Sequence, residues 1–257
     1  MNIIKNIKKI KLKLSILGNR SWVVRPVYKF YRICLSIMML IFKFFKILFL
    51  PVYIVKLYRT GKKFNLYKFI FFFLKNQEQG YYLNLFEKDI FLDVNKAFRK
   101  FDFKPFALFG TLVGIVNEGG VLFNDDDIDF GLFDKDFRSI NPEILFKNYD
   151  FKLHQNGFYQ FTMKTFPYLH FDIFSIKEDK KYYYVLDYSM GIKCKYYYPK
   201  EFLTEFKYIK LKCGIDVYVP VKGKEINEFT YGKYTKKSKK TDAFKGTGYR
   251  NILFDNH

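Results

Sequence analysis

Two blocks of sequence decide the fold: FGTLVGIV at residues 109–116 and FNDDDID at residues 123–129. The apolar residues 106–109 predict a short strand, and the first block continues into a short helix that a Gly-Gly pair ends. From the last residues of the second block onward, polar and apolar side chains alternate. This period of two predicts a strand with one polar face.

The segments on either side of these blocks predict further helices and strands. Apolar spacing predicts helices over 84–101 and 141–148, and strands over 159–164, 169–175, 182–186 and 209–219. The Lys-, Thr- and Ser-rich tail after Gly232 reads as loop. No regular βαβ series is present. We therefore expect an α/β fold of the α+β type, with an antiparallel or mixed sheet flanked by helices.

Composition excludes several classes of protein. The chain has 257 residues, of which 49% are hydrophobic, so a disordered chain is excluded. Three cysteines are too few for a disulfide-built scaffold. The aromatic fraction of 22% accompanies an abundance of Lys, Asn and Ile and is typical of a coding bias, so it argues only weakly for nucleic-acid binding. We expect no nucleic-acid partner.

The positive charge is concentrated at the start of the chain. Residues 1–80 hold 17 Lys and Arg against a single Glu, whereas residues 81–257 carry a net charge of only +4. This contrast predicts a basic region, 1–80, followed by a globular domain, 81–257.

The basic region is also strongly apolar. Residues 33–42 are uncharged, a run shorter than the roughly 20 residues that cross a bilayer. On a helical wheel, the surrounding polar side chains fall within about 100° of arc. They are Lys29, Arg32, Ser36, Lys43 and Lys46. A second apolar patch, 69–74, lies between two lysines.

We expect an amphipathic helical region that lies on an anionic membrane surface. Core helices of the globular domain and a spanning helix with embedded lysines are the alternatives.

The acidic residues of the second block need a physical reason. Asp125, Asp126, Asp127 and Asp129 place four negative charges within five residues beside an apolar strand. A divalent cation relieves such repulsion, and Asp oxygens suit Mg²⁺ or Mn²⁺. For the first two residues alone, a solvated loop is the favoured interpretation.

A third carboxylate for the same cation can come from another strand. Asp127 and Asp129 point to one face of their strand, and Asp172 is an isolated acid within the alternating segment HFDIF. The turn at Gly110 and Thr111 offers backbone N–H groups to a phosphate. Together these residues predict a metal-dependent phosphoryl-transfer site.

Other acidic motifs fit less well. An EF-hand would need Gly where Phe130 stands and Glu where Asp136 stands, so that motif is excluded. A lone Asp-x-Asp also suits a metal-dependent glycosyltransferase, but the tripeptide is common.

The two blocks resemble those of the LicD family, which includes bacterial phosphocholine transferases and is related to the fukutin-related proteins. HFDIF at 170–174 and FTYGKY at 229–234 are similar to later elements of that family. The chain departs from the family at Asn117, where Arg is frequent, and before the acidic block, where a Pro-Trp pair is frequent.

The resemblance implies a nucleotidyltransferase-like fold and transfer of phosphocholine or a polyol phosphate. The donor would be CDP-linked, and the acceptor a glycan or its lipid-linked precursor at the cytoplasmic face of a membrane. It also implies metal-binding and catalytic roles for Asp127, Asp129 and Asp172, and a donor-phosphate turn at Gly110 and Thr111. Two alternatives stay open: a nucleotidyltransferase that attaches NMP to a small acceptor, and a non-catalytic adaptor at a membrane surface.

Overall fold

The computed structural model describes residues 48, 50–59, 61–74, 78–123, 125–155, 157–167, 169–189 and 192–232. The chain divides into two compact units, residues 1–74 and 75–257, and each is described by itself. The division predicted after residue 80 falls within the first turns of a helix, and the independence of the two parts as domains stays a prediction.

The described part of the first unit consists of two helices, α3 (Leu50–Arg59) and α4 (Leu66–Leu74). Phe69 and Phe73 are buried, so these two rings of the predicted apolar patch do not form exposed surface. The amphipathic helix predicted around residues 29–46 lies outside the described residues. Among the helices that the structure describes, none combines the length and the apolar character needed to span a membrane.

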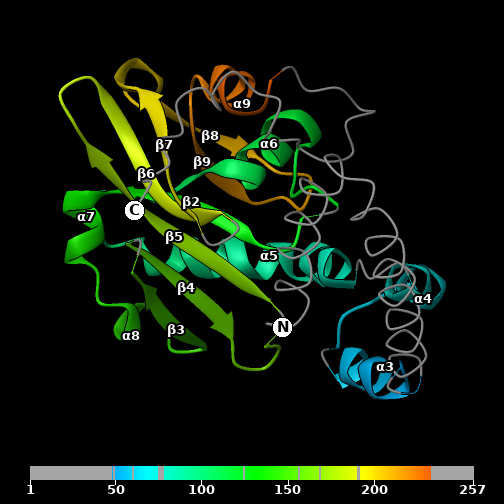
Figure 1. Ribbon diagram of the computed structural model, residues 1–257. Coiled ribbons are helices and arrows are strands. Elements are labelled where there is room, and N and C mark those ends of the chain that lie inside the picture. The colour runs from blue at the N-terminus through cyan, green and yellow to red at the C-terminus, as the bar shows by residue number, and fades with distance from the viewer. Residues whose placement is uncertain are drawn as a thin grey trace, which may run out of the picture. The chain divides into compact units, whose positions relative to one another are not determined.

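The second unit holds the remaining helices and strands (Figure 1). Its helical elements are α5 (Glu78–Ala97), α6 (Phe109–Glu118), α7 (Asp134–Ser139), α8 (Pro142–Leu145), the 3₁₀ turn η1 (Lys200–Phe202) and α9 (Gly223–Tyr231). Its strands are β1 (Phe106–Ala107), β2 (Ile128–Phe133), β3 (Tyr149–His154), β4 (Phe158–Met163), β5 (His170–Glu178), β6 (Tyr182–Ser189), β7 (Ile192–Pro199), β8 (Phe206–Lys210) and β9 (Asp216–Pro220).

The main sheet is mixed, which confirms the predicted fold class. Its order is β1-β2-β5-β4-β3, with β6 joined to the far end of β5 and β7 paired with β6. The central pair β2–β5 is parallel, and the other pairs are antiparallel. Strands β8 and β9 form a separate hairpin. Figure 1 shows α5 crossing the sheet, and α6 and α9 near the β8–β9 hairpin.

The core lies between α5 and one face of the sheet. Phe91 of α5 meets Phe130 of β2 edge-on at 5.7 Å between ring centroids, and Phe130 meets Phe171 of β5 at 6.1 Å. All three rings are at most 1% exposed. Burying each such side chain contributes about 1.5–3 kcal/mol. This packing fixes which face of β2 and β5 turns away from α5, and that other face carries the predicted acidic residues.

Three local predictions differ from the structure. Strand β2 has the predicted acidic residue Asp129 on one face, but both of its faces are buried, because α6 also packs against it. The helix predicted over 141–148 is only α8, since Asn141 caps it by accepting from the backbone N–H groups of Glu143 and Ile144 and the chain leaves the helix at Phe146. The single strand predicted over 209–219 is a hairpin, because Gly214 turns the chain with φ 85°.

Candidate metal and phosphoryl-transfer site

The structure brings the three predicted carboxylates together. Asp129 on β2 and Asp172 on β5 are register partners in the parallel pair, so their side chains share a face, and Asp127 precedes β2 by one residue. One oxygen of each carboxylate lies within 4.8 Å of those of the other two. Asp129 is 7% exposed and Asp172 is 6% exposed. Three acidic groups this close, two of them buried, repel one another strongly unless a cation or protons neutralise them.

The Gly-Thr turn begins helix α6 beside this cluster. Thr111 is fully buried, and its Oγ1 accepts a hydrogen bond of 2.8 Å from the backbone N–H of Asp129. The backbone carbonyl of Asp129 accepts from the N–H of Leu108 at 3.0 Å. The start of α6 therefore fixes the backbone of Asp129 from both sides.

The residue before this turn has a strained backbone. Phe109 has φ 46°, in the left-handed region that side chains other than Gly rarely adopt. Its ring meets Phe174 at 5.1 Å and Tyr196 at 5.2 Å between centroids, both edge-on. These ring contacts offset a strain of roughly 1–3 kcal/mol. Phe109 links the turn to β5 and to the β6–β7 hairpin, and so closes one side of the carboxylate site.

Asp125 packs against the same turn, and its carboxylate is enclosed. A Cβ at Gly110 would lie 2.5 Å from Asp125 Oδ2, so a side chain at this position would displace the carboxylate from where it lies. The Oδ2 atom is buried and makes no hydrogen bond within the described residues, although the residue as a whole is half-buried. Burial, assisted by the charge of Asp126, raises the pKa of Asp125 to about 7. The predicted solvated loop is therefore confirmed for Asp126, which is exposed, and is wrong for Asp125.

Helix α5 holds the acidic segment from its other side. A Cβ at Gly80 would lie 2.4 Å from the carbonyl oxygen of Phe123, so the segment passes almost in contact with this helix. Gln79 Nε2 donates to the carbonyl of Asp126 at 2.9 Å, and Glu87 Oε1 accepts from the N–H of Val121 at 3.0 Å. Burial raises the pKa of Glu87. These contacts set the path of the chain between α6 and β2.

His170 lies on the same face as the carboxylates, as its place in the alternating segment predicts. Its Nε2 is 3.9 Å from Asp127 Oδ2, and the two side chains are 20% and 30% exposed. The partly exposed side of the cluster is therefore formed by His170 and Asp127, and its buried side by Asp129 and Asp172.

Sequence reasoning did not single out Tyr231 as a site residue. Asn227 Nδ2 donates to the carbonyl of Leu112, and Gly223 lies against Leu112 and Val116, so α9 packs on α6. One turn beyond Asn227, Tyr231 lies toward the start of α6. Burial raises the pKa of Tyr231 well above its usual value, and the charge of Asp129 adds to this rise. The only sign of this in the sequence was the weak resemblance of the Tyr-Gly pair at 231–232 to the family, and the position of Tyr231 near the charge of Asp129 gives that pair a physical reason.

The donor set fits a hard divalent cation. Buried carboxylate oxygens on two adjacent strands, with no cysteine among them, suit Mg²⁺ or Mn²⁺ better than zinc. The acidic cluster could hold such an ion, and nothing in the donor set identifies which one. A second group, formed by Asp125, Asp126 and Asp127, also has oxygens within 4.8 Å of one another.

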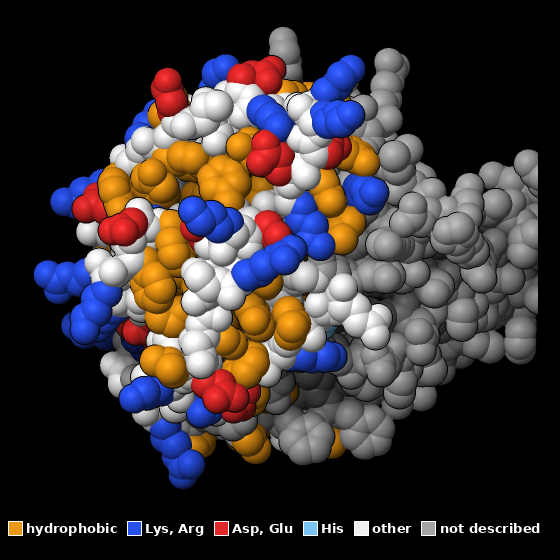
Figure 2. Space-filling model, turned by 90° about the vertical axis from the view of Figure 1, so that its left-hand side faces the viewer, with side chains coloured by type: hydrophobic (Ala, Val, Ile, Leu, Met, Phe, Trp, Pro, Cys, Tyr) orange, Lys and Arg blue, Asp and Glu red, His pale blue; other side chains and the backbone are white. Residues whose placement is uncertain are grey.

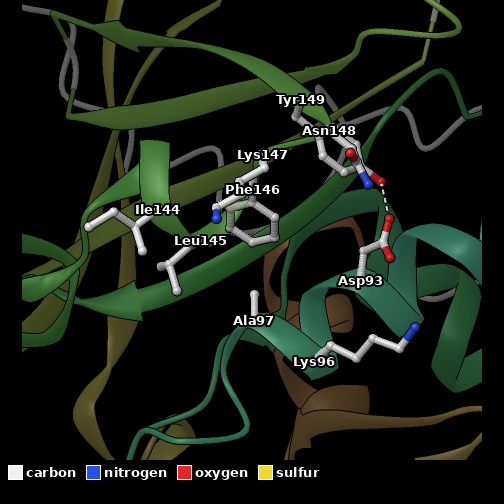
Figure 3. Close-up of a pocket in the computed structure, with 9 residues that line it drawn as sticks. All are labelled: Asp93, Lys96, Ala97, Ile144, Leu145, Phe146, Lys147, Asn148 and Tyr149. Carbon is white, nitrogen blue, oxygen red and sulfur yellow. Dashed lines mark hydrogen bonds between the residues drawn. The ribbon is translucent and has the colours of Figure 1, made fainter.

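A separate pocket lies on the other face of the sheet. It encloses about 270 Å³ between α5 and the segment that leads from α8 into β3, and Tyr149 donates there to Asp93 Oδ2 at 2.9 Å (Figure 3). Tyr149 contacts Phe171, whose side chain points away from that of its neighbour Asp172. The ammonium groups of Lys96 and Lys147 point away from one another (Figure 3). This pocket is therefore not part of the carboxylate site.

The surface in Figure 2 mixes hydrophobic side chains with charges of both signs. This pattern agrees with the small net charge of residues 81–257.

Comparison with known proteins agrees with this geometry. Residues 103–222 match the family model described as LicD/FKTN/FKRP, nucleotidyltransferase domain. The matched segment contains the Gly-Thr turn, the acidic segment and both strands that carry the carboxylates. No curated protein matches the chain significantly. With its mixed sheet, its clustered carboxylates and this match, the segment 103–222 is a nucleotidyltransferase domain of the LicD type, which is found in a family of transferases.

Proposed function

We propose that this protein transfers a phosphorylated small alcohol, phosphocholine or a polyol phosphate, from a CDP-linked donor to a glycan or its lipid-linked precursor. The observation that carries the proposal is the convergence of Asp127, Asp129 and Asp172 beside the turn at Gly110 and Thr111, within a LicD domain. Buried carboxylates grouped on two adjacent strands have no packing role that would offset their repulsion.

In the proposed reaction, an acceptor hydroxyl attacks the phosphorus that carries the alcohol. A new P–O bond forms, the bond from that phosphorus to the bridging oxygen breaks, and CMP leaves with that oxygen. Asp172 accepts the proton of the attacking hydroxyl and passes it to solvent; His170, at the partly exposed edge, is the weaker candidate. Mg²⁺ or Mn²⁺ held by the three carboxylates would neutralise the charge on the phosphate oxygens.

The rest of the site would orient these groups. Thr111 fixes the backbone of Asp129, and Phe109 closes the side toward the β6–β7 hairpin. With this support, the carboxylates need not rearrange when the donor binds, which is the condition for effective electrostatic stabilisation.

The test uses the purified full chain with CDP-choline and CDP-ribitol in the presence of Mg²⁺ or Mn²⁺. Release of CMP would support phospho-alcohol transfer, and release of pyrophosphate from a nucleoside triphosphate would instead support nucleotidyl transfer to a small acceptor. Asp127→Asn should abolish turnover, whereas Asp216→Asn, which changes an exposed carboxylate on β9, should leave it intact. Full activity of Asp127→Asn would refute the role of the cluster, and a non-catalytic adaptor would bind no divalent cation there.

We also propose that the basic region, residues 1–80, associates with an anionic membrane surface at the cytoplasmic face, where a lipid-linked acceptor would be presented. Its 17 Lys and Arg against one Glu support this proposal, since each cation near an anionic leaflet contributes about 1 kcal/mol. The full chain should sediment with phosphatidylserine vesicles and resist extraction by high salt. Protein that stays in the supernatant under low salt would contradict the association.

A further inference from the structure

The face of the sheet that bears the carboxylates continues beyond them as two rows of polar side chains. The register places Asp129 of β2 beside Asp172 of β5, Asp172 beside Gln160 of β4, and Gln160 beside Lys152 of β3. Side chains of register partners share a face, so these four form one row across the strands. With neighbouring strands about 4.8 Å apart, the row is about 15 Å long.

A second row runs parallel to the first. Asp127 lies against His170 at the start of β5, His170 pairs with Thr162 of β4, and Thr162 pairs with Asp150 of β3. On the opposite side of the first row, the aromatic rings of Phe174, Phe158 and His154 stack in sequence, with centroids 4.7 Å and 4.3 Å apart. A row of stacked aromatic rings therefore borders the two polar rows on one side.

The outer half of these rows, called here the β3–β4 platform, consists of Gln160 and Thr162 on β4 and Asp150 and Lys152 on β3. Gln160 and Thr162 are half-buried, and Asp150 and Lys152 are exposed. Within the described part of the chain, the side chains of Gln160, Thr162 and Lys152 make no hydrogen bond or ion pair. Asp150 has only a distant ion pair with Lys164, at 4.0 Å, and its side chain is 75% exposed. The polar atoms of the platform are therefore available to a ligand.

The chemistry of the platform favours a neutral ligand that carries several hydroxyl groups. An amide and a hydroxyl both donate and accept hydrogen bonds, as sugar hydroxyls do, while Lys152 supplies donors and Asp150 supplies acceptors. The charges of Lys152 and Asp150 cancel, and Lys164 beside Asp150 adds only one exposed cation, so a pyrophosphate or another polyanion gains little there. The CDP part of a donor is accordingly a poor candidate, and an uncharged glycan is a good one.

We infer that the β3–β4 platform binds the glycan acceptor and presents one of its hydroxyl groups to the carboxylate cluster. This inference rests on the proposed function and deepens it, because it locates the acceptor along the row that ends at Asp172. Gln160, about one strand spacing from Asp172, holds the part of the glycan next to the attacking hydroxyl, and Lys152 holds the part further out.

The test measures glycan binding apart from catalysis. The full chain is applied to an array of defined neutral oligosaccharides, and binding is compared with that of Gln160→Ala and Lys152→Ala. Two matched controls change exposed side chains off the platform: Leu153→Ala, 54% exposed on the opposite face of β3, and Lys207→Ala on β8. We expect the wild type to bind at least one glycan and each platform variant to bind it at least tenfold more weakly, with both controls unchanged. Absence of any glycan binding by the wild type, or equal binding by the platform variants, would overturn the inference.

A second measurement separates this inference from the proposed function. CMP release from CDP-choline or CDP-ribitol without a glycan, by transfer to water, depends on the carboxylate cluster and not on the platform. Gln160→Ala and Lys152→Ala should therefore raise the KM for a glycan acceptor, whereas Lys207→Ala on β8 should leave both that KM and the CMP release without glycan unchanged. A wild type that binds a glycan through Gln160 but releases no CMP would end the proposed function and leave the platform. A wild type that releases CMP but binds no glycan would support the proposed function and overturn the assignment of the platform.

Discussion

Replacing Asp172 with Asn should make the metal-free protein more stable. Asp172 is 6% exposed, and its carboxylate lies within 4.8 Å of those of Asp127 and Asp129. At this separation and an effective dielectric constant of about 20, each pair of unit charges repels by about 3.5 kcal/mol. Asp172→Asn removes two of these pairs and keeps the shape of the side chain. Because Asp127 is partly in contact with water and the cluster takes up protons, we expect a net gain of about 2–4 kcal/mol.

The assay is thermal unfolding of the full chain, first in EDTA and then with Mg²⁺ or Mn²⁺. In EDTA, the variant should melt roughly 4–16 °C above the wild type, at about 2–4 °C for each kcal/mol. A metal at 100 times its Kd should then stabilise the wild type by about 2.7 kcal/mol and leave Asp172→Asn nearly unchanged. Asp216→Asn, which changes an exposed carboxylate, should behave as the wild type in both conditions. A variant that is less stable than the wild type in EDTA, or one that gains as much from the metal, would refute the role assigned to the cluster.

Three further substitutions test the support of the site. Thr111→Val removes the hydroxyl that accepts a hydrogen bond from the N–H of Asp129. We expect it to lower the free energy of unfolding, measured by urea titration, by about 1–3 kcal/mol and to weaken Mn²⁺ binding. The control Thr204→Val, at an exposed position, should change neither quantity. Gly114→Ala places a Cβ 2.5 Å from the carbonyl oxygen of Gly120 and 2.7 Å from the backbone nitrogen of Leu122. It should therefore destabilise the fold by about 1–3 kcal/mol or more. A stability within about 0.5 kcal/mol of the wild type, as for a neutral surface change, would show that the segment 120–122 can move aside. Asp125 has a folded pKa of about 7 against 3.8 when unfolded, so its stabilising contribution is complete below pH 3.8 and is lost as the pH rises to 7. Asp125→Asn should therefore gain on the wild type over this range in EDTA, by up to about 4 kcal/mol at pH 8, and a constant difference between pH 4 and pH 8 would contradict the shift.

The carboxylate cluster was predictable because its residues carry strong local signals. Alternating polarity placed Asp127 and Asp129 on one face, and an isolated acid in an apolar strand marked Asp172. What joined them was the parallel pairing of β2 with β5, which brings residues more than 40 positions apart into register. The periodicity of a sequence does not tell which strands pair. The meeting of Asp172 with Asp127 and Asp129 could therefore be inferred only from the family resemblance or seen in the structure.

Other features depend on tertiary contacts and could not be read locally. The enclosure of Asp125 follows from the absence of a side chain at Gly110 and from the passage of its segment along Gly80. Tyr231 comes under the influence of the charges of Asp129 and Asp125 only because α9 packs on α6. The platform residues Gln160 and Lys152 look like ordinary exposed positions of two strands until the register aligns them with Asp172.

Helix α5 lies outside residues 103–222, yet it supplies one side of the hydrophobic core and the contacts that hold the acidic segment. Shortening the protein to residues 103–222 would remove α5, and with it the helix that packs on one face of the sheet and the hydrogen bonds that hold the loop before β2. The segment that matches the family model and the segment that holds the hydrophobic core and the acidic loop together therefore begin at different residues in this molecule. Any shortened version intended for crystallisation or assay should start before residue 78.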